Sequence, residues 1–171
     1  MRYLARHAAT ETSLRQILTR RVDRWVRAQP DAEAAADTLP AAHQAIEAVI
    51  ARLVELGAVN DAAFASTRGL GLLRSGVSRR GVAARMAAKG IDPAEAIAAL
   101  PEDADSELAA ALVLARKRRI GPFSANETDD PDARRRAFGI LARAGFPSDI
   151  ARQALAMERE EAEARIFALR Q

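Results

Sequence analysis

Two stretches of this chain repeat one pattern of residues, and this repeat limits the folds that the chain can adopt. Residues 86–100 align without gaps with residues 141–155, which places Gly90 over Gly145. Each copy has the pattern of a helix ended by glycine, a short turn and a second helix. A repeated helix–turn–helix unit predicts a modular, all-α array. Arrays of this kind present long surfaces that usually bind other molecules rather than catalyse reactions.

The composition favours many helices with thin cores. Hydrophobic residues make up 49% of the chain but aromatic residues only 4%, and alanine supplies much of the apolar content. Alanine is the best helix former and buries little area. There is no cysteine, which excludes disulfides, thiolate metal sites and a cysteine nucleophile and fits the cytoplasmic location that we expect. Neither a signal peptide nor a membrane-spanning stretch is recognisable, so no membrane partner is expected.

Basic and acidic segments alternate along the chain. The net charge is only +3, but residues 67–90 carry six basic and no acidic side chains, and residues 91–107 carry six acidic and no basic ones. Residues 108–123 are again purely basic, with four such side chains. If the modules stack in parallel, the basic helices would form a stripe suited to a polyanion or an acidic protein surface. The alternative is a set of solvated helix faces whose opposite charges pair between neighbours.

Capping residues, glycines and prolines divide the chain into expected helices. Thr10 or Thr12 is expected to cap a basic helix that ends before Pro30, and residues 31–39 are interpreted as an Ala-rich surface insertion. A short helix is also expected over residues 3–7. The remaining helices are expected from Pro40 to Gly57, from Asp61 to Ser75, from Ser78 to Lys89, from Asp92 to Leu100, from Ser106 to about Arg119, from Asp130 to Gly145, from Pro147 to Leu155, and over 158–169.

Helical spacing also predicts which side chains are buried. Gly69 and Gly71 are expected to mark close packing within their helix. One apolar face is expected in the helix after Pro40, made by Ile46, Val49, Ile50, Leu53, Val54 and Leu56. A second is expected in the helix after Asp130, made by Phe138, Leu141 and Ala142.

No group of residues has the pattern of a catalytic site, so we expect a protein that is not an enzyme and that uses no cofactor or metal. His7 and His43 are the only histidines and lack metal-ligand spacing. Gly69-Leu-Gly71 lacks the lysine and hydroxyl residue of a phosphate-binding loop. Asp129-Asp130 precedes a proline that can open a helix, so a helix cap is a better explanation than a catalytic carboxylate pair.

Three clusters of basic residues are the candidate sites for binding a partner or nucleic acid. Arginine dominates them, and its planar fork matches phosphate or carboxylate groups, although a codon preference would also enrich arginine. Only Phe123 and Phe138 are interleaved, so base stacking is not expected as their main mode of binding. The candidates are Arg79, Arg80, Arg85 and Lys89, then Arg116, Lys117, Arg118 and Arg119, then Arg134, Arg135, Arg136 and Arg143.

Several motifs together resemble the RecX family of bacterial recombinase regulators. The segment Leu56-Gly-Ala-Val-Asn-Asp-Ala-Ala-Phe64-Ala resembles the junction after the family's first module. The basic helix from Arg79 to Gly90 resembles the second helix of its second module. Arg118-Arg-Ile-Gly-Pro-Phe123, together with 135–138 and 141–146, resembles its third module. The resemblance covers nearly the whole chain, and the order and spacing of the motifs make it specific.

The resemblance implies three tandem three-helix modules in an elongated, curved array. The corresponding boundaries are 1–57, with an insertion at about 22–40, then 58–100 and 101–157, followed by a helical extension at 158–171. It also implies a non-enzymatic, monomeric protein that binds the RecA–DNA filament and restrains its ATP hydrolysis and strand exchange in recombination, DNA repair and the SOS response. The basic second helices of modules two and three would form the contact surface, and single- or double-stranded DNA could be touched through its phosphates.

The chain departs from the family pattern in its first module. Ala58-Val59-Asn60 stands where the family has Tyr-Leu-Asp, and residues 22–40 replace the glycine turn. Two other functions therefore stay open: a DNA-binding helical-repeat protein that acts without a recombinase, and a helical scaffold for protein interactions. Steeply salt-dependent binding to naked DNA would favour the former. The scaffold would be favoured if neutralising the arginine clusters changed nothing.

Overall fold

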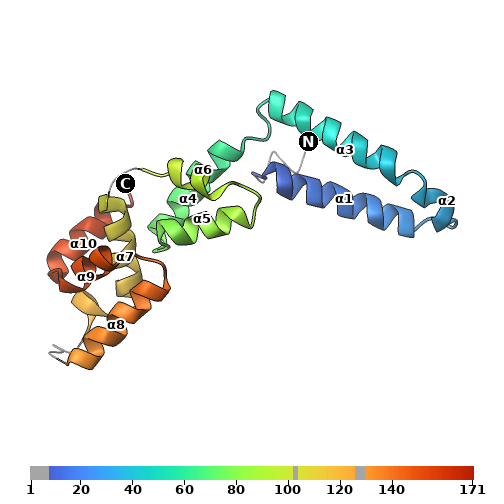
Figure 1. Ribbon diagram of the computed structural model, residues 1–171. Coiled ribbons are helices and arrows are strands. Elements are labelled where there is room, and N and C mark those ends of the chain that lie inside the picture. Colours follow the sequence, from blue (N-terminus) through green and yellow to red (C-terminus); the bar gives the residue numbers. More distant parts are fainter. Residues whose placement is uncertain (1–7, 102–103, 126–129) are drawn as a thin grey trace. The chain divides into compact units, whose positions relative to one another are not determined.

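A computed structural model of the chain describes residues 8–101, 104–125 and 130–171, and within these ranges every regular element is a helix (Figure 1). The prediction of an all-α fold is confirmed. The described residues divide into two compact units: one takes those up to Phe64 with Ala88–Ile91, and the other takes Ala65–Ala87 with those from Asp92 onward. The grouping into three modules in a curved array stays a prediction. No described helix is long and apolar enough to cross a membrane.

The first unit is built around a helical hairpin. α1 (Glu11–Arg27) runs alongside α3 (Leu39–Glu55), with the short α2 (Ala32–Ala36) between them in the chain (Figure 1). Its core is small, as the alanine-rich composition predicts. Its buried residues are Leu14, Ile46, Ile50 and Val59, and the partly buried Leu18, Val22 and Leu53 pack against them.

The expected apolar face of α3 is only partly buried. Ile46 and Ile50 are buried, but Val49, Val54 and Leu56 are exposed, so the prediction is wrong for these three residues. The physical reason is that a two-helix hairpin covers only one narrow stripe of each helix. The segment expected as an insertion contains the last turns of α1, then α2 and the start of α3. The short helix expected over 3–7 lies outside the described residues.

The second unit packs its helices around α7 (Ala104–Arg118). This helix begins before Ser106, where the sequence placed its start, and contacts α9 (Ser148–Ala156) and α10 (Arg159–Ala168). Its residues from Leu108 to Val113 are buried all round, which explains its long apolar run. A short 3-10 turn (Gly121–Phe123) follows it, and α8 (Pro131–Arg143) packs against α9. The charged C-terminal segment is a separate helix anchored by the buried Ala162 and Ile166.

The remaining helices of this unit are α4 (Asp61–Arg74), whose first residues belong to the first unit, α5 (Arg79–Ala87) and α6 (Pro93–Ala98). Gly69 is buried, and an added Cβ would lie 2.6 Å from a methyl carbon of Leu100, whereas Gly71 faces open space. The expected close packing is thus confirmed for Gly69 and wrong for Gly71. In α8, Leu141 is buried as expected, but Ala142 is exposed and Ala137 is buried instead, one helical turn before Leu141.

Both copies of the sequence repeat form a helix, a glycine turn and a second helix. Gly90 after α5 has φ +82° and Gly145 after α8 has φ +88°, a left-handed conformation that favours glycine. Equivalent positions are buried in both copies, as Met86 and Leu141 are, and likewise Ile91 and Phe146. The repeat therefore encodes the same local structure twice.

A set of hydrogen bonds also occurs twice, and we name the two sets the first and second joint. In the first joint, the Thr10 hydroxyl accepts from the amide of Ser13 at the start of α1 and donates to the Lys89 carbonyl at 2.7 Å. In the second, the Ser78 hydroxyl accepts from the Gly81 amide at the start of α5 and donates to the Ala144 carbonyl at 2.7 Å. Each carbonyl belongs to the residue before a left-handed glycine.

A carboxylate completes each joint. The amide of Glu11, which follows Thr10, donates to the Asp61 carboxylate at 3.0 Å. The amide of Arg79, which follows Ser78, donates to the Glu107 carboxylate at 2.9 Å. Each carboxylate thus satisfies an amide at a helix N-terminus that has no partner within its own helix. Each joint therefore contains a hydroxyl group, the carbonyl of the residue before a glycine, and a carboxylate.

Candidate functional site

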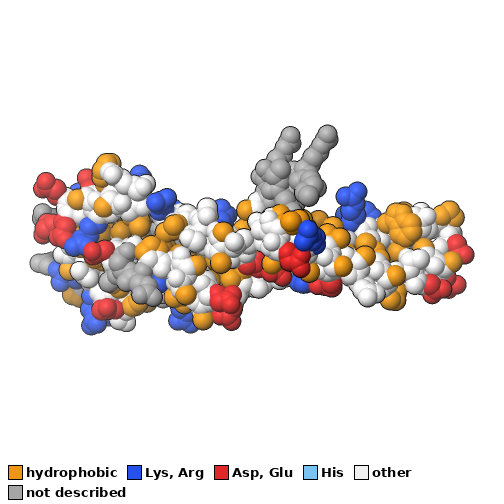
Figure 2. Space-filling view, turned by 90° about the horizontal axis from the view of Figure 1, so that it is seen from above, with side chains coloured by type: hydrophobic (Ala, Val, Ile, Leu, Met, Phe, Trp, Pro, Cys, Tyr) orange, Lys and Arg blue, Asp and Glu red, His pale blue; other side chains and the backbone are white. Residues whose placement is uncertain are grey.

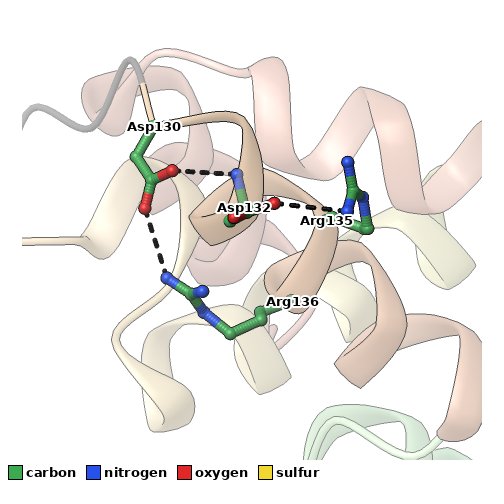
Figure 3. A network of polar contacts seen from close by, with 4 residues as sticks. All are labelled: Asp130, Asp132, Arg135 and Arg136. Carbon is green, nitrogen blue, oxygen red and sulfur yellow. Dashed lines mark hydrogen bonds and ion pairs between the residues drawn. The ribbon is translucent and has the colours of Figure 1, made fainter.

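The first candidate surface is the N-terminal half of α8, where three consecutive arginines are exposed: Arg134, Arg135 and Arg136. Two carboxylates share this turn (Figure 3). Asp130 caps the helix by accepting from the Asp132 amide at 2.9 Å, and its other oxygen pairs with Arg136 at 3.3 Å. Asp132 pairs with Arg135 at 3.2 Å. The sequence correctly predicted Asp130 as a cap but did not predict that it also holds an arginine.

These ion pairs are too exposed to fix the arginines in place. The side chains of Arg135 and Asp132 are 80% and 65% exposed, and pairs of this kind contribute about 0–1 kcal/mol. Their role is better understood from the helix dipole, because positive charge near a helix N-terminus is unfavourable and the two aspartates offset it. An incoming phosphate or carboxylate could therefore take over Arg135 and Arg136 at small cost.

A second group of cations has no such carboxylate nearby. Arg143 lies in the last turn of α8, and the turn that follows it approaches α5: a Cβ added at Gly145 would lie 3.5 Å from the Cβ of Arg80. Arg80, Arg85 and Arg143 are all exposed. Within the ranges that the structure describes, no ion pair joins any of the three to an acidic side chain. We name Arg80, Arg85 and Arg143 the unpaired arginines.

Arg79, a candidate binding residue in the sequence, is held by contacts within the fold. It is only half exposed, and its guanidinium donates to the carbonyl of Pro101 and to that of Ile97, the latter at 3.1 Å. Arg79 therefore holds the end of α6 against α5. Its repeat equivalent, Arg134, is exposed, whereas Arg79 is only half exposed.

The cluster at the end of α7 is divided in a similar way. Arg116 is half-buried, whereas Arg118 and Arg119 are exposed. The Lys117 ammonium donates to the Ser75 carbonyl at 2.7 Å and so fixes the end of α4. Lys89 is exposed and belongs to the first unit, where its carbonyl completes the first joint. The structure therefore brings together Arg80 and the end of α8 but does not merge all three sequence clusters.

Charges of both signs are interspersed over the face of α7 to α10 that is visible in Figure 2. On that face the basic side chains do not form the continuous stripe that the alternating segments suggested. The reason is visible in α8 itself, where carboxylates and arginines share one helical turn. These pairs lie within one helix and its cap, so the pairing between neighbouring helices that the sequence offered as an alternative stays a prediction.

Glu107 is the one buried acidic side chain among the described residues, with 5% of its surface exposed. Burial raises the pKa of its carboxyl group, and the hydrogen bond from the Arg79 amide together with the Arg79 charge opposes that rise. Its two oxygens both accept from this amide, at 2.9 and 3.2 Å. Glu107 therefore acts as a buried helix cap. This role could not be predicted from the sequence, because the amide that Glu107 caps is distant in the chain.

The described residues offer little for metal or small-molecule chemistry. No group of three or more potential metal ligands occurs among them. A shallow hollow between α1 and α3 is lined by His43, Ile46 and the ion pair of Arg15 and Glu47. The hydrogen bond from Arg15 lowers the pKa of the Glu47 carboxyl. His7 lies outside the described residues.

Known proteins resemble this chain over most of its length. A protein of Myxococcus xanthus named regulatory protein RecX is 37% identical over 158 residues, which cover 91% of this chain and 81% of that protein. A protein of the same name from Agrobacterium fabrum is 42% identical over 108 residues, or 62% of this chain and 56% of the relative. One from Corynebacterium efficiens is 31% identical over 147 residues, or 78% and 68% of the two chains. No protein-family model matches the chain, and no solved structure matches it.

Proposed function

The chain belongs to the RecX family, and on this premise we propose that it regulates a RecA-type recombinase by binding its filament on DNA and restraining ATP hydrolysis and strand exchange. The relatives are named regulatory proteins, which supports a regulatory rather than a catalytic role. The proposal gives the chain no chemical step of its own. Its contribution is the free energy of binding to one state of the filament.

The observation that carries the proposal is the unpaired arginines of α5 and α8. An arginine without a carboxylate partner can give two parallel N–H donors of its guanidinium to a phosphate or to an acidic side chain of another molecule. Arg80 and Arg143 are next to the same glycine turn, at the C-terminal end of α8, where the helix dipole favours positive charge. Arg135 and Arg136 would join the contact by exchanging their exposed aspartate partners for the filament.

The central experiment titrates the single-strand-dependent ATP hydrolysis of the cognate recombinase with this protein at physiological salt. We expect the wild-type protein to suppress hydrolysis, and the triple variant R80A/R85A/R143A to need at least about tenfold more protein, since each lost charge-assisted contact is worth about 1.5–3 kcal/mol. Arg79 is left unchanged because its guanidinium holds the fold.

A matched control removes three other exposed arginines, in the variant R52A/R152A/R170A. It changes the net charge equally, so it should inhibit as the wild type does if position matters. Both variants should keep the wild-type helical circular dichroism. Full inhibition by a folded R80A/R85A/R143A variant would overturn the proposed surface, and a wild-type protein that leaves hydrolysis unchanged would overturn the proposed function.

DNA binding without a recombinase is the second candidate. It predicts a steep decrease of the binding constant for naked duplex DNA with salt, because each neutralised phosphate releases condensed counterions. Binding that strengthens only when the recombinase is present on the DNA would favour the filament. Tight duplex binding together with unchanged ATP hydrolysis would favour the alternative.

A further inference from the structure

The exposed side of α1, in the first unit, carries a second group of arginines that the proposed function does not use. Arg20, Arg21, Arg24 and Arg27 are all exposed. The opposite side of the same helix is its packing face, with Leu14 and Val26 buried and Leu18 and Val22 packed against the core of the hairpin. The arginines therefore lie on the one side of α1 that the hairpin leaves open.

The fold does not neutralise these charges. Within the described parts of the chain, no ion pair joins any of the four to a carboxylate, and the only bond of this group runs from Arg27 to the Asp23 carbonyl. Arg15 on the same helix, in contrast, forms a two-bond pair with Glu47 of α3. Like charges three and four residues apart, such as Arg20 with Arg24, destabilise a helix by about 0.2–0.5 kcal/mol per pair. This repulsion is only partly offset by the helix dipole, which favours Arg24 and Arg27 in the last turn of α1.

An aromatic side chain lies beside this group. Trp25 is 53% exposed, and it follows Arg21 by four residues, which makes the two neighbours on the helix surface. Tryptophan usually buries most of its surface, so an indole that is half exposed to water is unusual. Apolar side chains also reach the surface of the α1–α2–α3 region in Figure 2. Trp25 is the only tryptophan of the chain.

We propose that the exposed side of α1 binds single-stranded nucleic acid, with its arginines on the phosphates and Trp25 stacked on an unpaired base. Arginine forks match phosphate oxygens, and an exposed indole offers the flat surface on which a base stacks whatever its sequence. This inference does not rest on the proposed function, because it concerns a different unit and needs no recombinase.

Other polyanions fit this surface less well. A helix that lies on a membrane needs a broad apolar face to enter the lipid, but the apolar face of α1 is already covered by α3. Only Ile17 and Trp25 remain as exposed large apolar side chains on α1. An acidic protein would satisfy the arginines but would leave the indole without a planar partner. Single-stranded nucleic acid supplies both chemistries at once.

Trp25 provides a direct test, since all tryptophan fluorescence of this chain comes from it. Titration with an oligothymidylate should quench this fluorescence, and the quenching should weaken as salt is added. Binding constants K can also be measured by the fluorescence anisotropy of a labelled oligothymidylate. The slope of log K against log salt should be less steep by about 2 in the variant R20Q/R21Q/R24Q, because each contact with a single-strand phosphate contributes about 0.7. W25A should weaken binding about tenfold.

Matched titrations separate the other outcomes. The control variant R80Q/R85Q/R143Q should retain the quenching of Trp25. Anisotropy titrations of both α1 variants that match the wild type would overturn the proposal. Duplex DNA that binds as tightly as the single strand, with no effect of W25A, would also overturn it, because it would mean contact with phosphates alone. If oligothymidylate does not quench Trp25, two further results would identify another partner and overturn the proposal. One is a blue shift of the Trp25 emission with vesicles of an anionic lipid, and the other is saturable binding of polyglutamate. Because loss of ATPase inhibition is measured separately, failure here leaves the proposed function standing.

Discussion

The two joints use the same hydrogen bonds with different side chains, and their difference shows which parts of the pattern are essential. Thr10 and Ser78 share a hydroxyl, and Asp61 and Glu107 share a carboxylate. What changes is the closeness of packing. A Cβ added at Gly90 would lie 2.0 Å from the Thr12 hydroxyl oxygen, whereas one added at Gly145 would lie 2.9 Å from that of Ser78. The two joints therefore have the same hydrogen bonds but differ in how closely the glycine is packed.

The glycines should show the largest difference between the joints. Both have a positive φ, which costs a residue with a side chain about 1–2 kcal/mol. An added Cβ crowds a hydroxyl in each joint, and the much deeper overlap with Thr12 at Gly90 adds about 1–3 kcal/mol, the usual cost of overpacking. We expect G90A to lower the free energy of unfolding by about 2–4 kcal/mol and G145A by about 1–2 kcal/mol, measured by urea denaturation. G90V should lower the free energy of unfolding more than G90A does. Equal losses for the two alanine variants would show that the packing difference has no energetic meaning.

The hydroxyls should have an effect of intermediate size. T10V keeps the shape of the side chain but leaves the Lys89 carbonyl and the Ser13 amide without their partner, and S78A does the same to the Ala144 carbonyl and the Gly81 amide. Loss of a cap costs about 0.5–2 kcal/mol, and both side chains are fully buried, so we expect about 2 kcal/mol for each.

The exchange variants T10S and S78T test the same point from the other side. They keep the hydroxyl and should stay within about 1 kcal/mol of the wild type in urea denaturation. If T10S were as unstable as T10V, the methyl group of Thr10 rather than its hydroxyl would carry the joint.

The carboxylates should have the smallest effect, and one that depends on pH. The folded-state pKa of Glu107 is raised by burial, so the folded protein holds this proton more tightly than the unfolded chain does. The contribution of Glu107 to the free energy of unfolding is therefore fully present below its ordinary pKa, and it is lost as the pH rises through the raised pKa. E107Q should flatten this decrease and stay within about 1 kcal/mol of the wild type at pH 7, because the amide oxygen can still accept from Arg79.

Two controls accompany the Glu107 measurement. E107A removes the acceptor altogether and should lose about 1–2 kcal/mol at acidic pH, and this loss should shrink as the pH rises through the raised pKa of Glu107. D61N is the matched change in the first joint. A pH dependence of unfolding that is the same in E107Q and the wild type would show that Glu107 is not its source.

Much of the local structure could be predicted from residues close together in the chain. The cap at Asp92, the cap at Asp130 and the left-handed glycines were all predicted because each depends only on neighbouring residues. The repeat predicted two equal helical pairs for the same reason. Predictions about inward faces were less successful, as Val49, Leu56 and Ala142 show, because a helix does not specify how much of its apolar side a neighbour will cover.

The candidate sites show the same limit more sharply. The sequence identified the arginines but could not separate Arg79 from Arg80, although they are adjacent, because the carbonyls that hold Arg79 come from the end of α6 and the segment after it. Nor could the sequence rank α1 among the candidates. That its arginines form no ion pair with the described carboxylates depends on how the hairpin packs.

The sequence by itself thus determined the helical class, the repeated turns and the supply of arginines, because short-range sterics and capping fix these within a few residues. Tertiary structure alone decided which charges are neutralised, which are buried and which remain open to a partner. Those outcomes depend on distances between residues far apart in the chain, as between Ser78 and Ala144 or between Arg79 and Glu107. Coulomb and hydrogen-bond energies change over ångströms, and sequence spacing does not specify such distances.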